Sequence, residues 1–575
     1  MRKGNKRLWA AFLAATVVSA SLAGCGQSAE KTDSAAAETT AAVEKTDSAA
    51  ADAAGEDAPK ELKTIRILGP DNSAVDNNGN TIYFSDWVNG ESKKWEQLVS
   101  DLEGYGVKLE LDLIPADQIE NVVQTQIAAG LDYDMVNIST VDTKTRMSLV
   151  EQGKLVSVNE IWENYSDGTA KEYYTTGAGS SVAKLNKLED GNQYWLTGVT
   201  YGDYKGRGVG SLVGAMIRYD WLQKLGLEMP TTTEELYQTL LAFQEQDANG
   251  NGQADEVITL NYNSFYNGIA QMYGLGTSSY FLDSETGKIT SPWYQDGIKD
   301  YITFMNRLFK AGLLDTSGQA KEKQAENKIS MVSTYWIGYS SEAAVTVPEG
   351  EQRAQFVGLV CDPENGCTPL VNSQSAVQKN TYDFAFTSNV DKEAAGRLLD
   401  YLTSEEYATL TEFGIEGYSY EVVDGVKQRF TDSDISECQI RVALWVNDCI
   451  FPRAETVDRA QELVTATEMG KSMGWPEEGF AAKADPVREV YENPDKYKLA
   501  VKSTELEVAV ATVEETERIA DLKTDFDTYS EELLTKLIMG DASLDNWDTY
   551  IAEMKELGLD ELIEITQARY DRTLG

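Results

Sequence analysis

Apolar residues recur along the chain in two different periods. Alternation or short apolar runs in LKTIRIL (62–68), VKLELDLIPA (107–116) and DYDMVNIS (132–139) predict strands. Spacings of three and four residues in KKWEQLVSDLEGYG (93–106) and NVVQTQIAAG (121–130) predict helices between them. The order strand, helix, strand, helix is typical of an α/β fold with a largely parallel sheet.

Helical periodicity dominates the rest of the chain. Four further segments carry it, at 232–246, 294–314, 391–414 and 545–572. The folded body is therefore predicted to be α/β and helix-rich.

The first 60 residues have a different pattern. Four basic residues precede a 16-residue weakly polar to apolar run, Leu8–Ala23, which has the shape of a signal peptide. The sequence Leu-Ala-Gly-Cys that follows resembles the lipobox of bacterial lipoproteins, which implies that Cys25 carries a lipid anchor; the alternative is a secreted protein with a chance cysteine. Residues 26–60 are mostly Ala, Thr, Ser, Asp, Glu and Lys, in a near-repeat, and favour a solvated tether or an Ala-rich helix.

Composition narrows the function classes. The 575 residues include no histidine, which excludes Ser-His-Asp and Cys-His catalysis and HExxH zinc sites. Lys and Arg number 50 against 94 Asp and Glu, giving a formal charge of −44. Removal of residues 1–24, with four basic and no acidic side chains, leaves −44 − 4 = −48. Such a charge repels phosphate backbones, so nucleic-acid binding is excluded.

Several segments, in order along the body, resemble one protein family. QIAAGLDYDMVNIS and LVEQGKLVSVNEI are similar to a segment of extracellular solute-binding proteins. A second segment of that family is similar to residues 214–256, GAMIRYDWLQKLGLEMPTTTEELYQTLLAFQEQDANGNGQADE. The series is completed by MNRLFKAGLLD (305–315), EFGIEGYSYEVVDG (412–425) and residues 546–572. Within the family 1 solute-binding proteins, these segments resemble the branch of large lipoproteins. The proteins of this branch serve carbohydrate ABC importers.

This resemblance implies a two-lobed, periplasmic-binding-protein-like (type II) fold that closes on a ligand by hinge motion. The expected organisation is a signal peptide (1–24), a lipidated tether (25–60), a first lobe (61–195 plus about 378–455) and a second lobe (196–377 plus about 456–575). The implied function is a monomeric binding lipoprotein that captures an oligosaccharide outside the cell membrane and delivers it to permease subunits. It would be held at the outer or periplasmic side by the lipid on Cys25 and would not be an enzyme.

One loop has the spacing of a calcium site. Asp247, Asn249, Asn251, Asp255 and Glu256 stand at relative positions 1, 3, 5, 9 and 10, with Gly252 at position 6 and the carbonyl of Gln253 at position 7. This matches an EF-hand loop except at position 12, where Ile258 replaces the bidentate Glu and Glu256 is the substitute. Oxygen donors of this kind suit Ca²⁺ in a structural role. An Asx-rich turn without a metal is the alternative.

Aromatic residues beside polar ones indicate a saccharide cleft, because sugar C–H faces pack on aromatic rings while hydroxyls take hydrogen bonds. The candidates for ligand contact are Asp86, Trp87, Trp195, Tyr335, Trp336 and Trp445. Packing in the core is the alternative for each tryptophan.

Two questions stay open from the sequence. Cys361, Cys367, Cys438 and Cys449 allow disulfides, most simply 361–367 and 438–449, or free thiols. Two other function classes also remain: a surface-anchored glycoside hydrolase or lyase, since the many acids can always supply a carboxylate pair, and a sugar sensor or adhesin without a transporter.

Overall fold

The structure is a computed structural model that describes residues 61–574 except 76–80, 91, 177–178, 203–208, 214, 261, 263, 266, 277, 284–285, 333–353, 355, 376, 424–425, 430–453, 458–497 and 502–507. The chain divides into two units, Met1–Ala58 and Pro59–Gly575, and all described residues belong to the second. None of the helices in these ranges has the length and apolar character needed to cross a bilayer.

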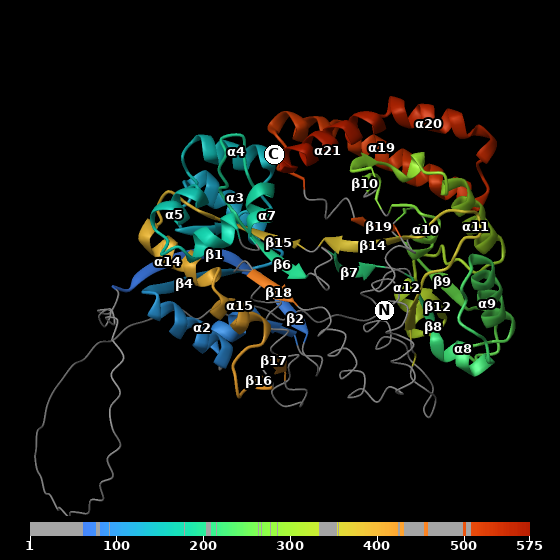
Figure 1. Cartoon of the computed structure of the whole chain (residues 1–575), viewed down its shortest axis with the longest axis horizontal. Coiled ribbons are helices and arrows are strands. Elements are labelled where there is room, and N and C mark those ends of the chain that lie inside the picture. The colour runs from blue at the N-terminus through green and yellow to red at the C-terminus, as the bar shows by residue number, and fades with distance from the viewer. Residues whose placement is uncertain are drawn as a thin grey trace, which may run out of the picture. The chain divides into compact units, whose positions relative to one another are not determined.

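A six-stranded sheet organises the part that we term the first lobe (Figure 1). Its order is β18-β6-β15-β5-β1-β4. Strand β15 runs antiparallel to both of its neighbours, and the other three pairings are parallel. The strands are β1 (Lys63–Asp71), β4 (Val107–Pro115), β5 (Met135–Asn137), β6 (Leu196–Gly202), β15 (Val377–Phe386) and β18 (Ala454–Val457).

Helices and two small hairpins complete the first lobe. The helices are α1 (Phe84–Asn89), α2 (Lys93–Gly104), α3 (Ile119–Ala129), α4 (Thr143–Glu151), α5 (Val158–Asn164), α6 (Thr169–Thr175), α7 (Ser180–Leu185), α14 (Lys392–Leu402) and α15 (Glu405–Glu412). The hairpins pair β2 (Ser73–Val75) with β3 (Thr81–Tyr83) and β16 (Tyr420–Val423) with β17 (Val426–Arg429).

The second lobe has two sheets, ordered β13-β8-β12-β9 and β11-β10-β19-β14-β7. Their strands are β7 (Val209–Val213), β8 (Ala215–Arg218), β9 (Val257–Thr259), β10 (Phe281–Asp283), β11 (Lys288–Thr290), β12 (Ile329–Val332), β13 (Phe356–Leu359), β14 (Leu370–Ser375) and β19 (Lys498–Val501). Its helices are α8 (Tyr219–Leu225), α9 (Thr233–Glu245), α10 (Gly268–Met272), α11 (Ile298–Lys310), α12 (Ala320–Ala325), α19 (Val513–Met539), α20 (Trp547–Glu556) and α21 (Leu559–Leu574), with short 3-10 turns at Pro292–Tyr294 and Leu544–Asn546.

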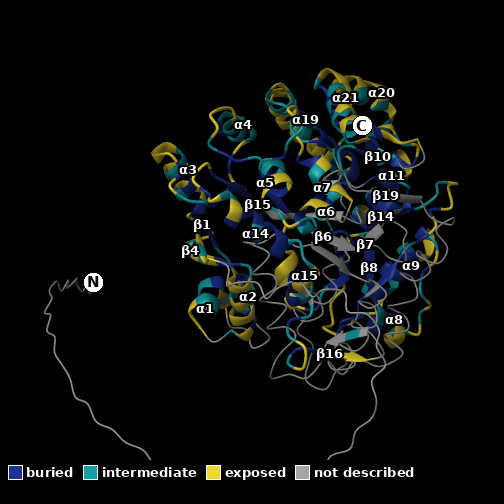
Figure 2. Cartoon of the chain, turned by 60° about the vertical axis from the view of Figure 1, so that its left-hand side comes forward, coloured by how far each residue is buried: buried dark blue, intermediate teal, exposed yellow. Residues whose placement is uncertain are grey.

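The two lobes have separate hydrophobic cores (Figure 2). In the first lobe, Ile65 and Ile67 pack in one cluster and Leu68 in another, because successive residues of a strand point to opposite faces of the sheet. In the second lobe, Trp221 and Leu534 belong to one large cluster that joins α8 and α9 to α19. The prediction of an α/β, two-lobed, helix-rich fold is confirmed.

The chain passes between the sheets of the two lobes in three places. The passage from β18 to β19 runs through residues outside the described ranges, and the other two join strands that are described. One runs from β6 to β7, and the other from β14 to β15, with β6 paired to β15 in the first lobe and β7 paired to β14 in the second. We term these four strands the crossover ribbon. A further link precedes α19, where the amide of Val510 donates to the carbonyl of Leu185 in α7.

Local sequence signals explain where the helices begin and end. The Thr232 hydroxyl accepts from the amide of Glu235, and the Glu235 carboxylate accepts from the amide of Thr232, so α9 begins with a capping box. The same motif begins α19 at Thr512 and Glu515.

Three helical features differ from the sequence expectation. The helix predicted over 391–414 is two helices, because Ser404 caps α15. The one predicted over 545–572 is also two, because Gly558 takes a left-handed backbone with φ of 98° between α20 and α21. The 27-residue helix α19 was not expected at all.

Candidate functional site

The loop at 247–256 lies in the second lobe, between the end of α9 and the start of β9. Asp247 has a positive φ of 51°, and Gly250 and Gly252 have φ of 76° and 81°, so the backbone turns sharply around the loop side chains. Asp247 Oδ2 accepts from the amide of Gly252 at 2.8 Å. Asn249 Oδ1 accepts from the amide of Asn251 at 2.9 Å. The predicted ligand residues therefore belong to one closed loop.

Asp255 and Glu256 close the loop from its far end. Asp255 Oδ1 accepts from the side-chain amides of Asn249 and Asn251, each at 3.0 Å. Glu256 is fully buried, and its two oxygens accept from the amides of Asn249 at 3.0 Å and Asp255 at 3.2 Å. Burial raises the pKa of the Glu256 carboxyl above its ordinary value, although the backbone hydrogen bonds act against this.

A cation would satisfy an atom that the loop itself leaves without a partner. Asp247 Oδ1 is buried, and none of the residues that the structure describes donates a hydrogen bond to it. Lys328 lies 3.2 Å from Asp255 Oδ2 and offsets part of the loop's negative charge from outside. The donor set therefore fits a hard cation such as Ca²⁺ in its chemistry. In the described residues, however, no three His, Cys, Asp or Glu side chains converge as a preformed metal cluster.

The first-lobe candidates lie at the end of β3. Asp86 is exposed on α1, and its Oδ2 accepts from the amide of Tyr83 at 2.9 Å, so it stabilises the helix start. Trp87, next to it, is half-buried. This places both residues on the helix that follows β1 and its hairpin, where α/β folds bind ligands beyond the carboxyl ends of strands.

Trp195 is 2% exposed and packs in a first-lobe core cluster. The Arg146 guanidinium lies over its ring, 5.2 Å from the centroid. A ring so deeply buried leaves no face for a sugar, so its position matches the packing alternative. The other ligand candidates Tyr335, Trp336 and Trp445, like Cys25, lie outside the described residues.

No disulfide joins Cys361 to Cys367 in this structure, so the simplest pairing for these two described cysteines is not formed. Cys361 is buried, its sulfur lies 3.5 Å from the carbonyl oxygen of Pro230, and burial raises the pKa of its thiol well above the ordinary value. Cys438 and Cys449 lie outside the described residues.

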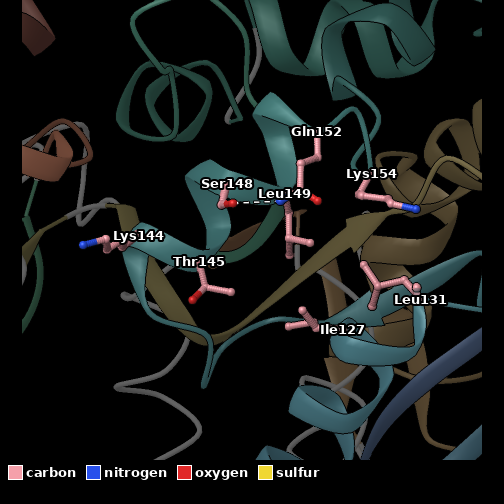
Figure 3. Close-up of a pocket in the computed structure, with 9 residues that line it drawn as sticks. Ile127, Leu131, Lys144, Thr145, Ser148, Leu149, Gln152 and Lys154 are labelled. Carbon is pink, nitrogen blue, oxygen red and sulfur yellow. Dashed lines mark hydrogen bonds between the residues drawn. The ribbon is translucent and has the colours of Figure 1, made fainter.

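A pocket of about 350 Å³ opens between α3 and α4 of the first lobe (Figure 3). Apolar Ile127, Leu131 and Leu149 line it together with polar residues of α4. All lining residues belong to the first lobe and none is a predicted ligand contact, so this pocket is not the predicted site between lobes.

The structure also brings together polar residues that the sequence did not single out. Arg146, Thr197 and Asp383 meet at the first-lobe end of the crossover ribbon, with Thr197 Oγ1 and Arg146 Nη1 donating to Asp383 at 2.6 and 2.7 Å. They are separated by 51 to 237 positions along the chain, and no sequence pattern links residues so far apart.

Two lobes joined by a crossover ribbon define a class of binding proteins that close on a ligand by hinge motion. The chain belongs to the family of bacterial extracellular solute-binding proteins, whose model matches residues 88–409, more than half of the chain. This match covers parts of both lobes and spans both passages of the ribbon.

Similar curated proteins carry transport or lipoprotein names. The chain is 29% identical over 177 residues to the fructooligosaccharide ABC transporter substrate-binding protein FusA of Streptococcus pneumoniae, covering 29% of this chain and 32% of FusA. It is 23% identical over 344 residues to the polygalacturonan/rhamnogalacturonan-binding protein YtcQ of Bacillus subtilis, covering 58% and 65%. It is 25% identical over 255 residues to the lipoprotein LipO of Bacillus subtilis, covering 40% and 48%. The matches thus span between about a third and two thirds of these relatives.

Solved structures share the fold over 89% of this chain and 99% of theirs. A solute-binding protein of Bifidobacterium longum infantis described as binding HMO has a TM-score of 0.61 at 18% identity. The EF-hand mutant of S. pneumoniae FusA with fructo-nystose has 0.60 at 19%, and the alginate-binding protein AlgQ2 without calcium ion has 0.57 at 18%. At these identities the likeness establishes the fold.

Proposed function

We infer that this chain is the substrate-binding lipoprotein of an ABC importer, which captures an oligosaccharide between its lobes and delivers it to the permease. The family match across both lobes carries this inference. The names of FusA and YtcQ support a carbohydrate ligand, since both describe saccharide-binding proteins. Trp87, half-buried on the helix that follows the first strands, supplies an aromatic face of the kind that packs against sugar rings.

Capture in such a protein needs no covalent chemistry. A cleft binds by shape, aromatic faces and directed hydrogen bonds, and closure of the hinge excludes water from the bound sugar. The chain has no histidine for proton transfer, in keeping with a binding role and no enzymatic activity.

Anchoring follows from the N-terminal sequence. The lipobox-like Leu22–Cys25 and the relative named lipoprotein LipO support a lipid on Cys25. The lipid on Cys25 would hold the protein at the outer face of the membrane, and the strongly acidic body would be repelled from anionic surfaces, which leaves the lobes free to move.

The loop at 247–256 is the proposed Ca²⁺ site. The EF-hand-like spacing supports it, as does the buried Asp247 oxygen, which has no donor among the described residues. Two proteins of the same fold are described with reference to calcium or an EF-hand, namely AlgQ2 without calcium ion and the EF-hand mutant of FusA. Asp247, Asn249, Asn251, Asp255 and Glu256, with the carbonyl of Gln253, would hold the ion. Its contribution would be to fix the turn from α9 into β9.

Isothermal titration calorimetry of the mature soluble body against a glycan panel tests the function. The panel should hold neutral fructans, neutral host glycans, and acidic galacturonans and alginates, with a peptide mixture as the control. Binding of one glycan class with micromolar or tighter affinity is expected. Binding of the peptide mixture with no response to any glycan would overturn the carbohydrate assignment.

A further inference from the structure

The crossover ribbon contains one irregular point. Lys379 of β15 pairs with Val199 of β6, and the next pair is Asp383 with Thr197. Residues 380–382 of β15 therefore stand opposite residue 198 alone, which is a bulge in the ladder. Bulges bend a strand and interrupt its hydrogen bonds, so this is the point where the ribbon is least constrained by its own pairing.

A cluster of side chains holds the ribbon on the first-lobe side of that bulge. Thr197 Oγ1 donates to Asp383 Oδ1 at 2.6 Å, and the buried Asn186 Nδ2 donates to Thr197 Oγ1 at 2.6 Å. The Asp383 amide donates to Ser139 Oγ at 2.8 Å. Both passages of the ribbon are thus bonded to each other, and Asp383 is bonded to the loop after β5.

Arg146 of α4 completes the cluster. Its Nη1 donates to Asp383 Oδ2 at 2.7 Å, its Nε donates to the carbonyl of Val141 at 2.8 Å, and its Nη2 donates to the carbonyl of Ile138 at 2.7 Å. The Arg146 and Asp383 side chains are only 13% and 21% exposed, so water screens the pair weakly. We term Ser139, Arg146, Asn186, Thr197 and Asp383 the ribbon brace.

We propose that the ribbon brace sets the pivot of lobe closure, with Asp383 as the positioning residue. The brace makes the ribbon up to Thr197 and Asp383 part of the rigid first lobe. Bending is then confined to the bulge and to the ribbon beyond it, since a hinge is a few residues that absorb the backbone change. The proposal rests on the ligand-capturing function, because closure is what the pivot would serve.

The physical basis is the contrast between the two sides of residue 383. On one side, charged and neutral hydrogen bonds tie the ribbon to α4, to α7's end and to the loop after β5. On the other side, the bulge removes ladder bonds. A defined pivot reduces the number of open conformations, and this raises ligand affinity by lowering the entropy lost on closure.

The test measures the distance between the lobes without any ligand. Spin labels are attached through unnatural amino acids at exposed Glu120 in α3 and exposed Glu245 in α9, so that native cysteines stay intact. Double electron–electron resonance then gives the distance distribution for wild type and for Asp383→Asn. A distribution at least twofold broader in Asp383→Asn is expected, because the pivot is no longer fixed.

The matched control is Asp315→Asn in the second lobe. The Asp315 carboxylate is more buried than that of Asp383, with a side chain 3% exposed against 21%. Its Oδ1 accepts from Lys323 Nζ at 2.5 Å and Ser317 Oγ at 2.7 Å, and neither partner belongs to the ribbon. This variant is expected to keep the wild-type distribution. If Asp383→Asn does not fold, Thr197→Val replaces it, since that change removes the hydroxyl that donates to Asp383 and accepts from Asn186 but keeps the Arg146–Asp383 ion pair.

Ligand binding separates this proposal from the proposed function. For a glycan found by the panel, Asp383→Asn is expected to weaken affinity about tenfold through faster dissociation, with association nearly unchanged. An unchanged distance distribution in both Asp383→Asn and Thr197→Val would overturn the pivot even if wild type binds glycans. If the variants broaden the distance distribution but the wild-type protein binds no glycan, the carbohydrate function is overturned and the pivot stands.

Discussion

The ribbon brace of the first lobe and the loop at 247–256 of the second lobe are both polar clusters built around aspartate side chains, yet the aspartate oxygens find their partners differently. In the brace, Arg146 supplies the positive charge and both Asp383 oxygens have donors. In the loop, buried Asp247 Oδ1 has no donor among the described residues, and Lys328 forms an ion pair with Asp255 at the edge of the loop. The brace therefore draws the positive charge and the donors for its carboxylate from the chain itself, whereas the loop has an oxygen that fits an added cation.

Because the two lobes have separate cores, their stabilities can be followed separately. A protein with two such units is expected to unfold in more than one transition. Each change below is therefore expected to move the transition of one lobe only.

The largest effect is expected from Arg146→Met. This change leaves the Asp383 carboxylate without its cation and removes the donor to the carbonyls of Ile138 and Val141. Loss of one partner of a mostly buried ion pair costs about 3 kcal/mol. Differential scanning calorimetry should show the first-lobe transition at lower temperature and the second-lobe transition unmoved.

The companion variant is Lys323→Met, which removes the cation that faces Asp315 in the second lobe. It should move the other transition and leave the first-lobe transition in place. If Arg146→Met shifts both transitions equally, the lobes do not unfold independently and the comparison between the two clusters loses its basis.

Removal of calcium should produce the next largest effect. A cation present at 100 times its dissociation constant stabilises the folded state by about 2.7 kcal/mol. Addition of EGTA should therefore lower the second-lobe transition by several degrees and leave the first-lobe transition unchanged. Asp247→Asn should lose this response, since it removes a carboxylate charge from the loop.

Glu245→Gln is the matched control, because Glu245 is an exposed acid at the end of α9 and is not one of the predicted ligands. This variant should keep the full response to EGTA. No shift with EGTA in wild type, together with no calcium by elemental analysis, would show that the loop is an Asx-rich turn that needs no metal.

Lys328→Met sharpens the comparison by removing the cation outside the loop. Lys328 pairs with Glu326 at 2.6 Å and Asp255 at 3.2 Å, and these carboxylates raise the pKa of its ammonium group, Glu326 most strongly. Without it, calcium affinity should rise about threefold, since a nearby positive charge no longer repels the ion. Stability without calcium should fall by less than about 1 kcal/mol.

Calorimetric titration with calcium, run beside Glu326→Gln, checks this expectation. Glu326→Gln removes the other partner of Lys328 and should leave calcium affinity near the wild-type value. Weaker calcium binding by Lys328→Met would mean that Lys328 orients Asp255 for the ion instead of competing with it.

Much of the fold follows from patterns that are local in sequence. Alternation in 62–68 and 107–116 predicted two strands that the structure has at β1 and β4. The EF-hand-like spacing predicted a closed loop because all its members lie within ten residues. Helix α19 also carried a local signal, the capping box of Thr512 and Glu515, which would have located its start.

The ribbon brace lay beyond prediction for a physical reason. Arg146 and Asp383 are 237 positions apart, and each resembles an ordinary surface residue in its own segment. Trp195 shows that local sequence can also suggest a contact that packing does not favour. An aromatic residue beside polar ones suggests a cleft, but the structure packs this ring in a core cluster. Contacts between distant segments depend on the arrangement of the sheet, which local periodicity does not contain.

The smallest effect on stability is expected from Arg307→Gln, which breaks the exposed ion pair between Arg307 and Glu234. The Arg307 guanidinium, with help from Gln238, lowers the pKa of the Glu234 carboxyl from 4.5 to about 2. Since that pKa is lowered on folding, the pair stabilises the protein above about pH 4.5 and this stabilisation is lost as pH falls toward 2. The side chains are 43% and 48% exposed, so the loss at pH 7 should be below about 1 kcal/mol.

Urea unfolding followed at pH 7, 5 and 3.5 checks this expectation. The difference in unfolding free energy between wild type and variant should shrink only below pH 4.5. A difference that stays constant to pH 3.5 would mean that the variant acts through lost packing of Arg307 on Tyr237, whose ring lies 3.9 Å from the guanidinium, and not through charge.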